Sequence, residues 1–431
     1  MNFDELELEA SVSEGLSAMH YKDMTPVQEL SIPTILKGKD VIACAQTGSG
    51  KTIAYVLPVI NKLSKGGYPE KSINAIIMAP TRELAQQIDQ QIEGISYFLP
   101  ISTVAVYGGT DGIVYAQQER GLQMGADIVI ATPGRLIAHM NMGSVDLSQV
   151  SFFILDEADR MLDMGFYDDI IQIFKCLPKD CQIILFSATM PPRIKSMAEN
   201  IMKNPEKIEI AISKPPESIL QSAYICYENQ KLKILENLFS QETRKRAILF
   251  SSSKLKVKEL AIILQRKKLK VAAMHSDLEQ AIREQSLKDF KNGHIDILVA
   301  TNVVARGIDI VDIDLIINYD VPHEPDDYIH RIGRTARGVE GKGLAITLVS
   351  EKEQYLFQVI EKFLGKDIYK MPPDPSIGKF PAYQPEKHKE EAYRREKGRN
   401  RQSREKKGAD SAVYKQRHSK HNPSRMANHK K

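Results

Sequence analysis

The stretch AQTGSGKT, residues 45–52, has the composition of a phosphate-binding loop, although Ala stands at its first position where Gly is usual. Its glycines allow positive φ angles, so that several backbone N–H groups can surround one anion. Lys51 would contact the β and γ phosphates of a nucleotide, and Thr52 would bring a hydroxyl to Mg²⁺. A plain Gly/Ser turn is the alternative interpretation. The expected nucleotide contacts are Ala45, Gln46, Thr47, Gly48, Ser49, Gly50, Lys51 and Thr52.

A cluster of carboxylates, Asp156-Glu157-Ala158-Asp159, follows the apolar run 152–155. One carboxylate there can hold Mg²⁺, and a second can polarise a water for in-line attack on a γ phosphate. We assign Asp156 to the metal and Glu157 to the water. An acidic first helical turn is the alternative, but Lys51 and Thr52 upstream favour catalysis.

Short apolar runs alternate with helical patterns through the first half of the chain. This alternation predicts a parallel sheet with helices on both faces, in which ligands bind beyond the carboxyl ends of the strands. The polar clusters should therefore meet at one edge. The expected strands are 41–44, 75–79, 128–131, 152–155 and 183–186.

A second α/β half follows an expected linker at Lys214-Pro215-Pro216, since proline continues neither a helix nor a central strand. The expected strand 247–250 is followed by SSSK, residues 251–254, in place of a second phosphate loop. One nucleotide site would therefore serve both halves, and the second half must contribute to it in another way. The expected strands are 247–250, 271–274, 297–300, 315–318 and 344–348. The expected divisions are a first domain 1–208, a linker 209–218, a second domain 219–370 and a tail 371–431.

Charge is distributed unevenly along the chain. Residues 371–431 contain 17 lysines and arginines against seven acidic residues, so the tail has a net charge of +10, which masks a net charge of −6 in residues 1–370. With few aliphatic side chains, this tail is expected to be disordered. It could tether RNA electrostatically, or it could serve solubility alone.

The composition otherwise predicts a cytoplasmic protein. No apolar run is long enough to span a membrane, and the first ten residues are acidic where a signal peptide would be basic. The four cysteines lack metal-ligand spacing and lie in or beside apolar runs, as reduced core thiols do.

The motifs occur in the order found in one family. Over about 365 residues the chain resembles a DEAD-box RNA helicase, a superfamily 2 enzyme with two RecA-like domains, and the compact organisation looks bacterial. The motifs that carry the resemblance are Thr25 to Gln28, Ala45 to Thr52, Pro80 to Ala85, Gly108-Gly109, Thr132 to Arg135, Asp156 to Asp159, Ser187 to Thr189, Gln280 with Arg283, Ala300-Thr301 with Ala305 to Asp309, and His330 to Arg337.

The resemblance implies ATP as the nucleotide and Mg²⁺ as its metal. Gln28 would recognise the adenine edge through its amide, and Tyr21 could stack on the base unless it belongs to the core. Phe3 is more readily explained by core packing. Gly307 would let backbone approach phosphate, and Asp309 would accept from the ribose.

The second half would complete the site with positive charge. His330, Arg334 and Arg337 share one face if their segment is helical, and the arginines would neutralise the γ phosphate when the domains close. His330 would bridge to the carboxylate cluster. A solvated arginine surface and a structural histidine are the alternatives. Ser187 and Thr189 would couple nucleotide state to unwinding through the carboxylate cluster, against an alternative of local turn hydrogen bonds.

The resemblance also implies RNA contacts that follow the sugar-phosphate backbone and read no sequence. The positions that match the family's RNA-contacting residues are Pro80, Thr81, Arg82, Gly109, Thr132, Pro133, Gly134, Arg135, Arg283 and Thr301.

We therefore expect a monomeric, ATP-dependent RNA helicase that unwinds short duplexes or remodels RNA–protein complexes. Ribosomal precursors or RNA-turnover machinery are the expected partners. An RNA clamp or assembly scaffold with little unwinding has the same motifs. A DNA translocase is disfavoured by the particular residues of the DEAD and HRIGRTAR motifs.

Overall fold

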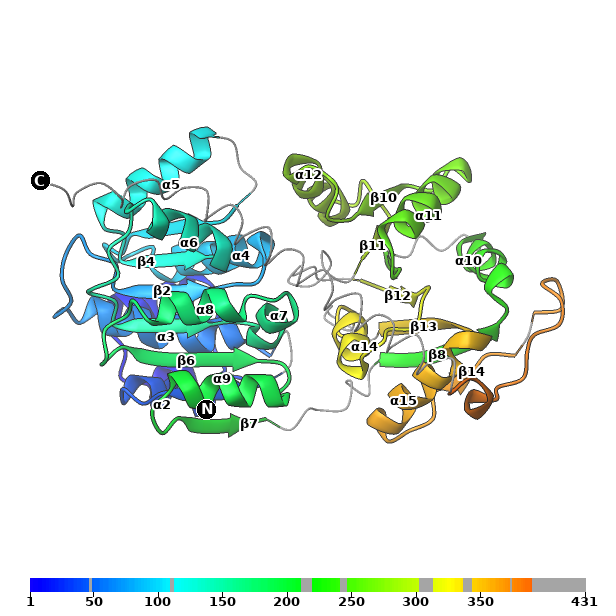
Figure 1. Ribbon diagram of the computed structural model, residues 1–431, viewed down its shortest axis with the longest axis horizontal. Coiled ribbons are helices and arrows are strands. Elements are labelled where there is room, and N and C mark those ends of the chain that lie inside the picture. Colours follow the sequence, from blue (N-terminus) through cyan, green and yellow to red (C-terminus); the bar gives the residue numbers. More distant parts are fainter. Residues whose placement is uncertain are drawn as a thin grey trace, which may run out of the picture. The chain divides into compact units, whose positions relative to one another are not determined.

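A computed structural model of the chain describes residues 1–45, 49–108, 112–210, 219–240, 246–301, 313–335, 343–372 and 374–389. Two seven-stranded sheets organise it (Figure 1). The first has the order β3-β4-β2-β5-β6-β1-β7, and its pairings are parallel. Its strands are β1 (Val41–Cys44), β2 (Ala75–Met78), β3 (Thr103–Val106), β4 (Ile128–Ala131), β5 (Phe152–Leu155), β6 (Gln182–Ser187) and β7 (Glu206–Glu209).

Helices cover both faces of the first sheet because successive strand residues point to opposite sides. Val41 and Ala43 join one apolar core, which includes side chains of α2, α3 and α4, whereas Ile42 joins the other, with side chains of α6, α8 and α9. The helices are α1 (Ala10–Ala18), α2 (Pro26–Leu36), α3 (Lys51–Ser64), α4 (Arg82–Ile95), α5 (Gly112–Met124), α6 (Pro133–Asn141), α7 (Ala158–Asp163), α8 (Tyr167–Phe174) and α9 (Pro192–Ile201), after the 3-10 turn η1 (Phe3–Glu5).

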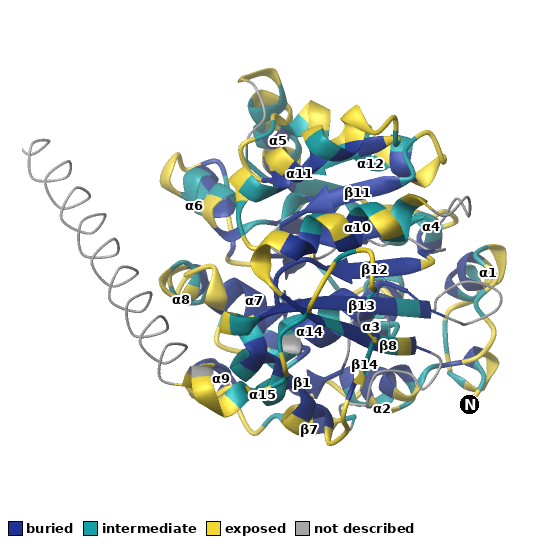
Figure 2. Cartoon of the chain, turned by 90° about the vertical axis from the view of Figure 1, so that its right-hand side faces the viewer, coloured by how far each residue is buried: buried dark blue, intermediate teal, exposed yellow. Residues whose placement is uncertain are grey.

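The second sheet has the order β10-β11-β9-β12-β13-β8-β14, and most of its strands are buried (Figure 2). Its strands are β8 (Ile219–Cys226), β9 (Ala247–Phe250), β10 (Val271–Met274), β11 (Ile297–Ala300), β12 (Leu315–Asn318), β13 (Gly343–Ser350) and β14 (Tyr369–Lys370). The other elements are η2 (Glu228–Gln230), α10 (Lys231–Ser240), α11 (Lys254–Arg266), α12 (Gln280–Lys291), α14 (Pro325–Ile332), η3 (Glu351–Glu353), α15 (Gln354–Leu364) and η4 (Pro385–His388).

The predicted α/β class and all ten predicted strands are confirmed, with ends that differ by at most two residues. The sequence did not predict β3, β7, β8 and β14. Three of these four, β3, β7 and β14, are edge strands, and β8 lies beside the edge strand β14. They carry polar or exposed residues, as β7 does with the pattern exposed, exposed, buried, exposed. Apolar runs identify central strands because both of their faces are covered.

The described chain divides into two compact units. The first takes the described residues of Met1–Leu220, Arg244–Ile316 and Asp326–Ala345, and the second those of Gln221–Thr243, Ile317–Pro325 and Ile346–Lys431. The strands of the second sheet are shared between these units. The division into domains 1–208 and 219–370 therefore stays a prediction.

The segment 374–389 packs against the rest of the second unit, to which it belongs, although composition predicts disorder from residue 371 onward. Gln230 Nε2 donates to the carbonyl of Lys379 (2.9 Å), and Tyr383 OH donates to Glu361 Oε2 (2.6 Å). Aromatic rings embedded in the proline-rich stretch, Phe380 among them, supply the apolar surface that its overall composition conceals. Residues 390–431 lie outside the described residues.

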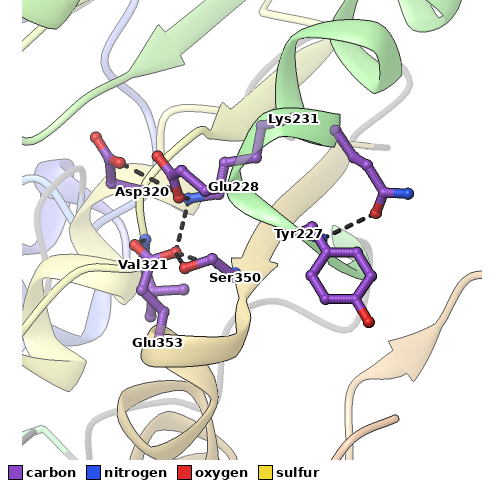
Figure 3. Close-up of polar contacts among 8 residues, drawn as sticks. Tyr227, Glu228, Lys231, Asp320, Val321, Ser350 and Glu353 are labelled. Carbon is purple, nitrogen blue, oxygen red and sulfur yellow. Dashed lines mark hydrogen bonds and ion pairs between the residues drawn. The ribbon is translucent and has the colours of Figure 1, made fainter. Parts of the chain in front are cut away.

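A buried cation joins several elements of the second unit (Figure 3). Lys231 is fully buried, and its Nζ lies 2.6 Å from Glu353, 3.1 Å from Glu228 and 3.8 Å from Asp320. Glu353 in turn accepts hydrogen bonds from the backbone N–H groups of Val321 and Ser350. This cluster links α10, the segment after β12, and the turn after β13.

The structure also bears on the cysteines and on the possibility of membrane-spanning helices. Cys44 and Cys226 are buried, but Cys176 is exposed, so not all four thiols belong to the core. None of the described helices combines the length and apolar character needed to cross a membrane.

Candidate active site

The phosphate-loop motif connects β1 to the amino end of α3. Helix α3 begins at Lys51, and Gly50 before it has a φ of 84°, in the left-handed region that favours glycine. A Cβ at this position would lie 2.4 Å from Gln28 Nε2. Conformation and close packing thus both require glycine here. Gln46, Thr47 and Gly48 lie outside the described residues.

Lys51 has the environment of an anion-binding residue. Its side chain is only 6% exposed, and its Nζ has no hydrogen-bond partner among the described residues. A buried, unpaired ammonium group is costly, and the N–H groups at the start of α3 add further positive potential. A polyphosphate would satisfy both, so this end of α3 fits a nucleotide.

Asp156 lies at the end of β5, within reach of the same helix. Its Oδ2 accepts from Tyr55 OH (2.8 Å), and its Oδ1 accepts from the backbone N–H of Glu157 (2.9 Å). Burial raises the pKa of Asp156 to about 6, although the charge of Lys51 opposes the rise. A divalent cation would stabilise the ionised form, so this carboxylate fits the expected Mg²⁺ ligand.

Glu157 is held ionised in a strained conformation. Its φ is 51°, and its Oε2 lies 3.1 Å from Arg160 Nη1. Burial opposes ionisation, but Arg160 and Lys51, with smaller contributions from Arg334 and His330, lower the pKa of Glu157 to about 2. Such a group is a weak proton acceptor, so it suits orienting and polarising a water better than removing its proton.

Asp159 connects the carboxylate cluster to β6. Its Oδ2 accepts from the backbone N–H of Ala188 (3.2 Å) and from both the N–H (2.9 Å) and Oγ1 (3.0 Å) of Thr189. Ser187 Oγ accepts from the Asp159 N–H and donates to the carbonyl of Thr189. The hydroxyls of Ser187 and Thr189 therefore lie against this cluster.

Gln28 links α2 to the phosphate loop. Its Oε1 accepts from the N–H of Thr25 (2.8 Å), and its Nε2 donates to the carbonyl of Gly50 (3.1 Å). Among the described residues these two bonds leave a second lone pair on Oε1 and a second N–H on Nε2, which could meet an adenine edge. Tyr21 is partly buried and contacts the ring of the buried Phe3 edge-on, at 6.3 Å between centroids.

A second site is a cleft of about 570 Å³ within the first compact unit. Seven of the ten expected RNA contacts line it, whereas Pro133 and Thr301 are buried and do not belong to its lining, and Gly109 lies outside the described residues. Arg283 pairs with Glu83 there, and Arg82 Nη1 donates to Gln280 Oε1 (3.3 Å). The expected residues in the lining are Pro80, Thr81, Arg82, Thr132, Gly134, Arg135 and Arg283, joined by Glu83, Gly108, Ala138, Met164, Phe166 and Ser276.

Aromatic rings support the Arg135 guanidinium in this cleft. Arg135 Nε donates to the carbonyl of Tyr107 (3.1 Å), and its Cζ lies 4.9 Å from the ring centroid of Tyr115. The ring of His139 also stacks on Tyr115, at 4.3 Å between centroids and 14° between planes. Burial lowers the pKa of His139, which keeps the stacked imidazole neutral.

The backbone of the arginine motif, His330 to Arg337, differs from the expected continuous helix over its described residues, 330–335. Helix α14 ends at Ile332, so the helix does not carry His330 and Arg334 on one continuous face. Thr335 Oγ1 donates to the carbonyl of Ile313, which holds the chain in a turn. Arg334 is buried, and its Nε donates to the carbonyl of His330 (3.3 Å). Arg337, Gly307 and Asp309 lie outside the described residues.

Sequence analysis missed three supporting residues of the nucleotide site. Tyr55 stands one helical turn after Lys51 in a run of apolar residues, where it resembles a core aromatic. Arg160 lies three residues after Glu157 and could have been found by the helical pairing rule. Asp159 was part of the motif but received no role of its own.

These features define a class of protein. One RecA-like sheet presents a phosphate-binding helix end beside ionised carboxylates, and a second sheet lacks that loop, as in nucleoside-triphosphate-dependent helicases. The model of the DEAD/DEAH box helicase family matches residues 25–197, and that of the helicase conserved C-terminal domain matches residues 230–339. The chain belongs to the DEAD-box ATP-dependent RNA helicases.

Two bacterial relatives illustrate this membership. The ATP-dependent RNA helicase CshA of Listeria monocytogenes is 40% identical over 365 residues, which cover 84% of this chain and 69% of the relative. The DEAD-box ATP-dependent RNA helicase RhpA of Helicobacter pylori is 40% identical over 368 residues, which cover 85% of this chain and 73% of the relative.

Solved structures agree with this fold. Dbp5 of S. cerevisiae bound to RNA and ADP BeF3 is 32% identical, with a TM-score of 0.78 over 87% of this chain and 96% of that one. Mss116p bound to ssRNA and AMP-PNP is also 32% identical, with a TM-score of 0.77 over 87% of this chain and 80% of that one. Of the alternatives, a DNA translocase loses its support, because the relatives are RNA helicases.

Proposed function

We propose that this helicase binds ATP at Lys51 and Thr52 and hydrolyses it with Glu157. The observation that carries the proposal is the buried Lys51 ammonium group, which has no hydrogen-bond partner among the described residues. Thr52 and Asp156 would hold Mg²⁺, which supplies positive charge to the phosphates when bound. Glu157 orients the attacking water, and Asp159 relays changes at the carboxylates to Ser187 and Thr189.

RNA binding and strand separation depend on the cleft. Its arginines and backbone groups suit phosphates and ribose, which would give binding without sequence readout. Arg334, with Arg337, would add charge that stabilises the transition state. ATP and RNA then each favour the same arrangement of the two predicted domains, and hydrolysis releases it.

The substitution Glu157→Gln tests this assignment. It keeps the shape of the side chain but removes its charge, so RNA-stimulated ATP turnover should fall by about 10²-fold or more while RNA and ATP still bind. Steady-state ATPase assays and fluorescence titrations measure these quantities. Lys51→Ala should instead abolish ATP binding.

The same change at an exposed glutamate of β7, Glu209→Gln, is the matched control and should leave turnover unchanged. Parental turnover in Glu157→Gln would show that another group orients the water. A strand-displacement assay separates unwinding from the clamp alternative, since a clamp would hydrolyse ATP and hold RNA without displacing a short strand.

A further inference from the structure

A run of positive charge covers α11 and the four residues after it. Residues 254–270 contain seven lysines and arginines and one glutamate, whereas the rest of residues 1–370 contains 35 basic and 47 acidic residues. The remainder of the body is therefore strongly acidic. A polyanion approaching it would meet repulsion over much of the surface and attraction at this segment.

The cations occupy the outer side of α11. Its inner side chains, such as Val257, Leu260 and Leu264, are buried in the core. The exposed basic residues of the segment, which we name the α11 face, are Lys254, Lys258, Arg266, Lys267, Lys268 and Lys270.

The α11 face begins beside the cleft. Lys254 Nζ lies 2.5 Å from Asp277 Oδ1, and Lys258 Nζ lies 3.7 Å from Asp277 Oδ2. Asp277 directly follows Ser276, which lines the cleft. At the other end of the helix, Gln265 Nε2 donates to the carbonyl of Val271 (2.9 Å), at the start of the edge strand β10. A helix of this length extends for about 20 Å, so the face leads away from the cleft by that distance.

We propose that the α11 face binds the sugar-phosphate backbone of RNA that extends beyond the cleft. At its near end two lysines share one carboxylate, and at its far end residues 266–270 supply four cations. Exposed Leu255 and Ile262 would also suit an acidic protein segment, but continuity with the cleft favours RNA. The proposal rests on the RNA binding of the family and not on the role of any one cleft residue.

The test neutralises the far end of the α11 face in the full chain. Lys268 is changed to Asn because its φ of 63° is tolerated by asparagine. A control variant removes the same charge from four exposed lysines elsewhere. The test variant carries Arg266→Gln, Lys267→Gln, Lys268→Asn and Lys270→Gln, and the control carries Lys37→Gln, Lys65→Gln, Lys175→Gln and Lys179→Gln.

Affinity is measured as a function of salt for single-stranded RNAs of about 10 and about 30 nucleotides, the shorter being near the site size of one binding groove. The test variant should bind the short RNA as the parent does. It should bind the long RNA at least about 10-fold more weakly, with a log–log salt slope smaller by about 3, since each lost phosphate contact removes about 0.7. The control should retain the parental affinity and slope.

Parental affinity of the test variant for the long RNA would overturn the proposal, as would equal weakening for both lengths. If the variant instead lost binding of polyglutamate while binding long RNA normally, the surface would serve an acidic protein and the proposal would again be wrong. Failure of the parent to bind the short RNA would count against the cleft, whereas the difference between long and short RNA tests the face alone.

Discussion

At the scale of single residues, the position of Arg135 depends on a stack of rings. The guanidinium lies over Tyr115, and the ring of His139 stacks on the same tyrosine. His139 is itself fixed by Gln118, whose Oε1 lies 3.4 Å from its Nε2. A flexible arginine would lose side-chain entropy on binding RNA, so stacking that restricts it beforehand should strengthen binding.

We therefore predict that Tyr115→Leu raises the RNA dissociation constant about 3–10-fold, because an arginine–ring contact contributes about 0.5–1.5 kcal/mol. Tyr115→Phe keeps the ring and should stay within about twofold of the parent. Fluorescence anisotropy with labelled RNA measures both. In an Arg135→Ala background, Tyr115→Leu should have no further effect. Equal weakening by Leu and Phe would contradict the role of stacking.

At the scale of elements, the Lys231 cluster joins segments that are distant in sequence. One ammonium group contacts three carboxylates, and Glu353 also accepts two backbone hydrogen bonds (Figure 3). The charges of Glu353 and Asp320 raise the pKa of Lys231 despite its complete burial. The lysine is thus charged. Buried Asp320 and largely buried Glu353 depend on its charge, whereas Glu228 is exposed.

Lys231→Met should lower the free energy of unfolding by about 3–5 kcal/mol, because it leaves buried carboxylates without a counter-charge. Urea denaturation followed by circular dichroism measures the change. Adding Glu353→Gln should restore part of the loss, since the double variant removes one of the unpaired charges. A single variant as stable as the parent would show that the cluster contributes nothing net.

At the scale of the whole molecule, the C-terminal region has two parts with different roles. Residues 374–389 contact the second unit through Gln230, Glu361 and Gln354, whose Nε2 donates to the carbonyl of Ala382 (2.9 Å). Residues 390–431 contain 14 lysines and arginines against five acidic residues. The first part belongs to the folded unit, and the second carries the charge.

Two truncations should therefore differ. Ending the chain at Lys389 should preserve stability and ATPase activity but weaken RNA binding and flatten its salt dependence. Ending it at Lys370 should in addition cost about 3 kcal/mol, since three or more hydrogen bonds of about 1 kcal/mol each are lost. Thermal unfolding and salt-dependent RNA titration distinguish the two. Equal melting temperatures would contradict the packing role of 374–389, and equal salt slopes for the full chain and the longer truncation would contradict the tether.

The sequence by itself determined the central architecture, and it supplied the proposal for the residues of the nucleotide site. Runs such as 152–155 identify buried strands because apolar side chains on both faces need two covered surfaces. Glycine at position 50 and the lysine after it identify the loop, since only such residues combine a left-handed backbone with a cation at a helix end. Both signals are local, so a short stretch of sequence contains all the residues that each signal needs.

Only the tertiary structure decided which distant side chains meet. Asp159 reaches Thr189 across 30 residues, and Tyr115 supports Arg135 from another helix. After α14 ends at Ile332, Thr335 likewise donates a hydrogen bond to Ile313, 22 residues earlier. The packing of whole elements decides which side chains meet, and local sequence periodicity does not predict that packing.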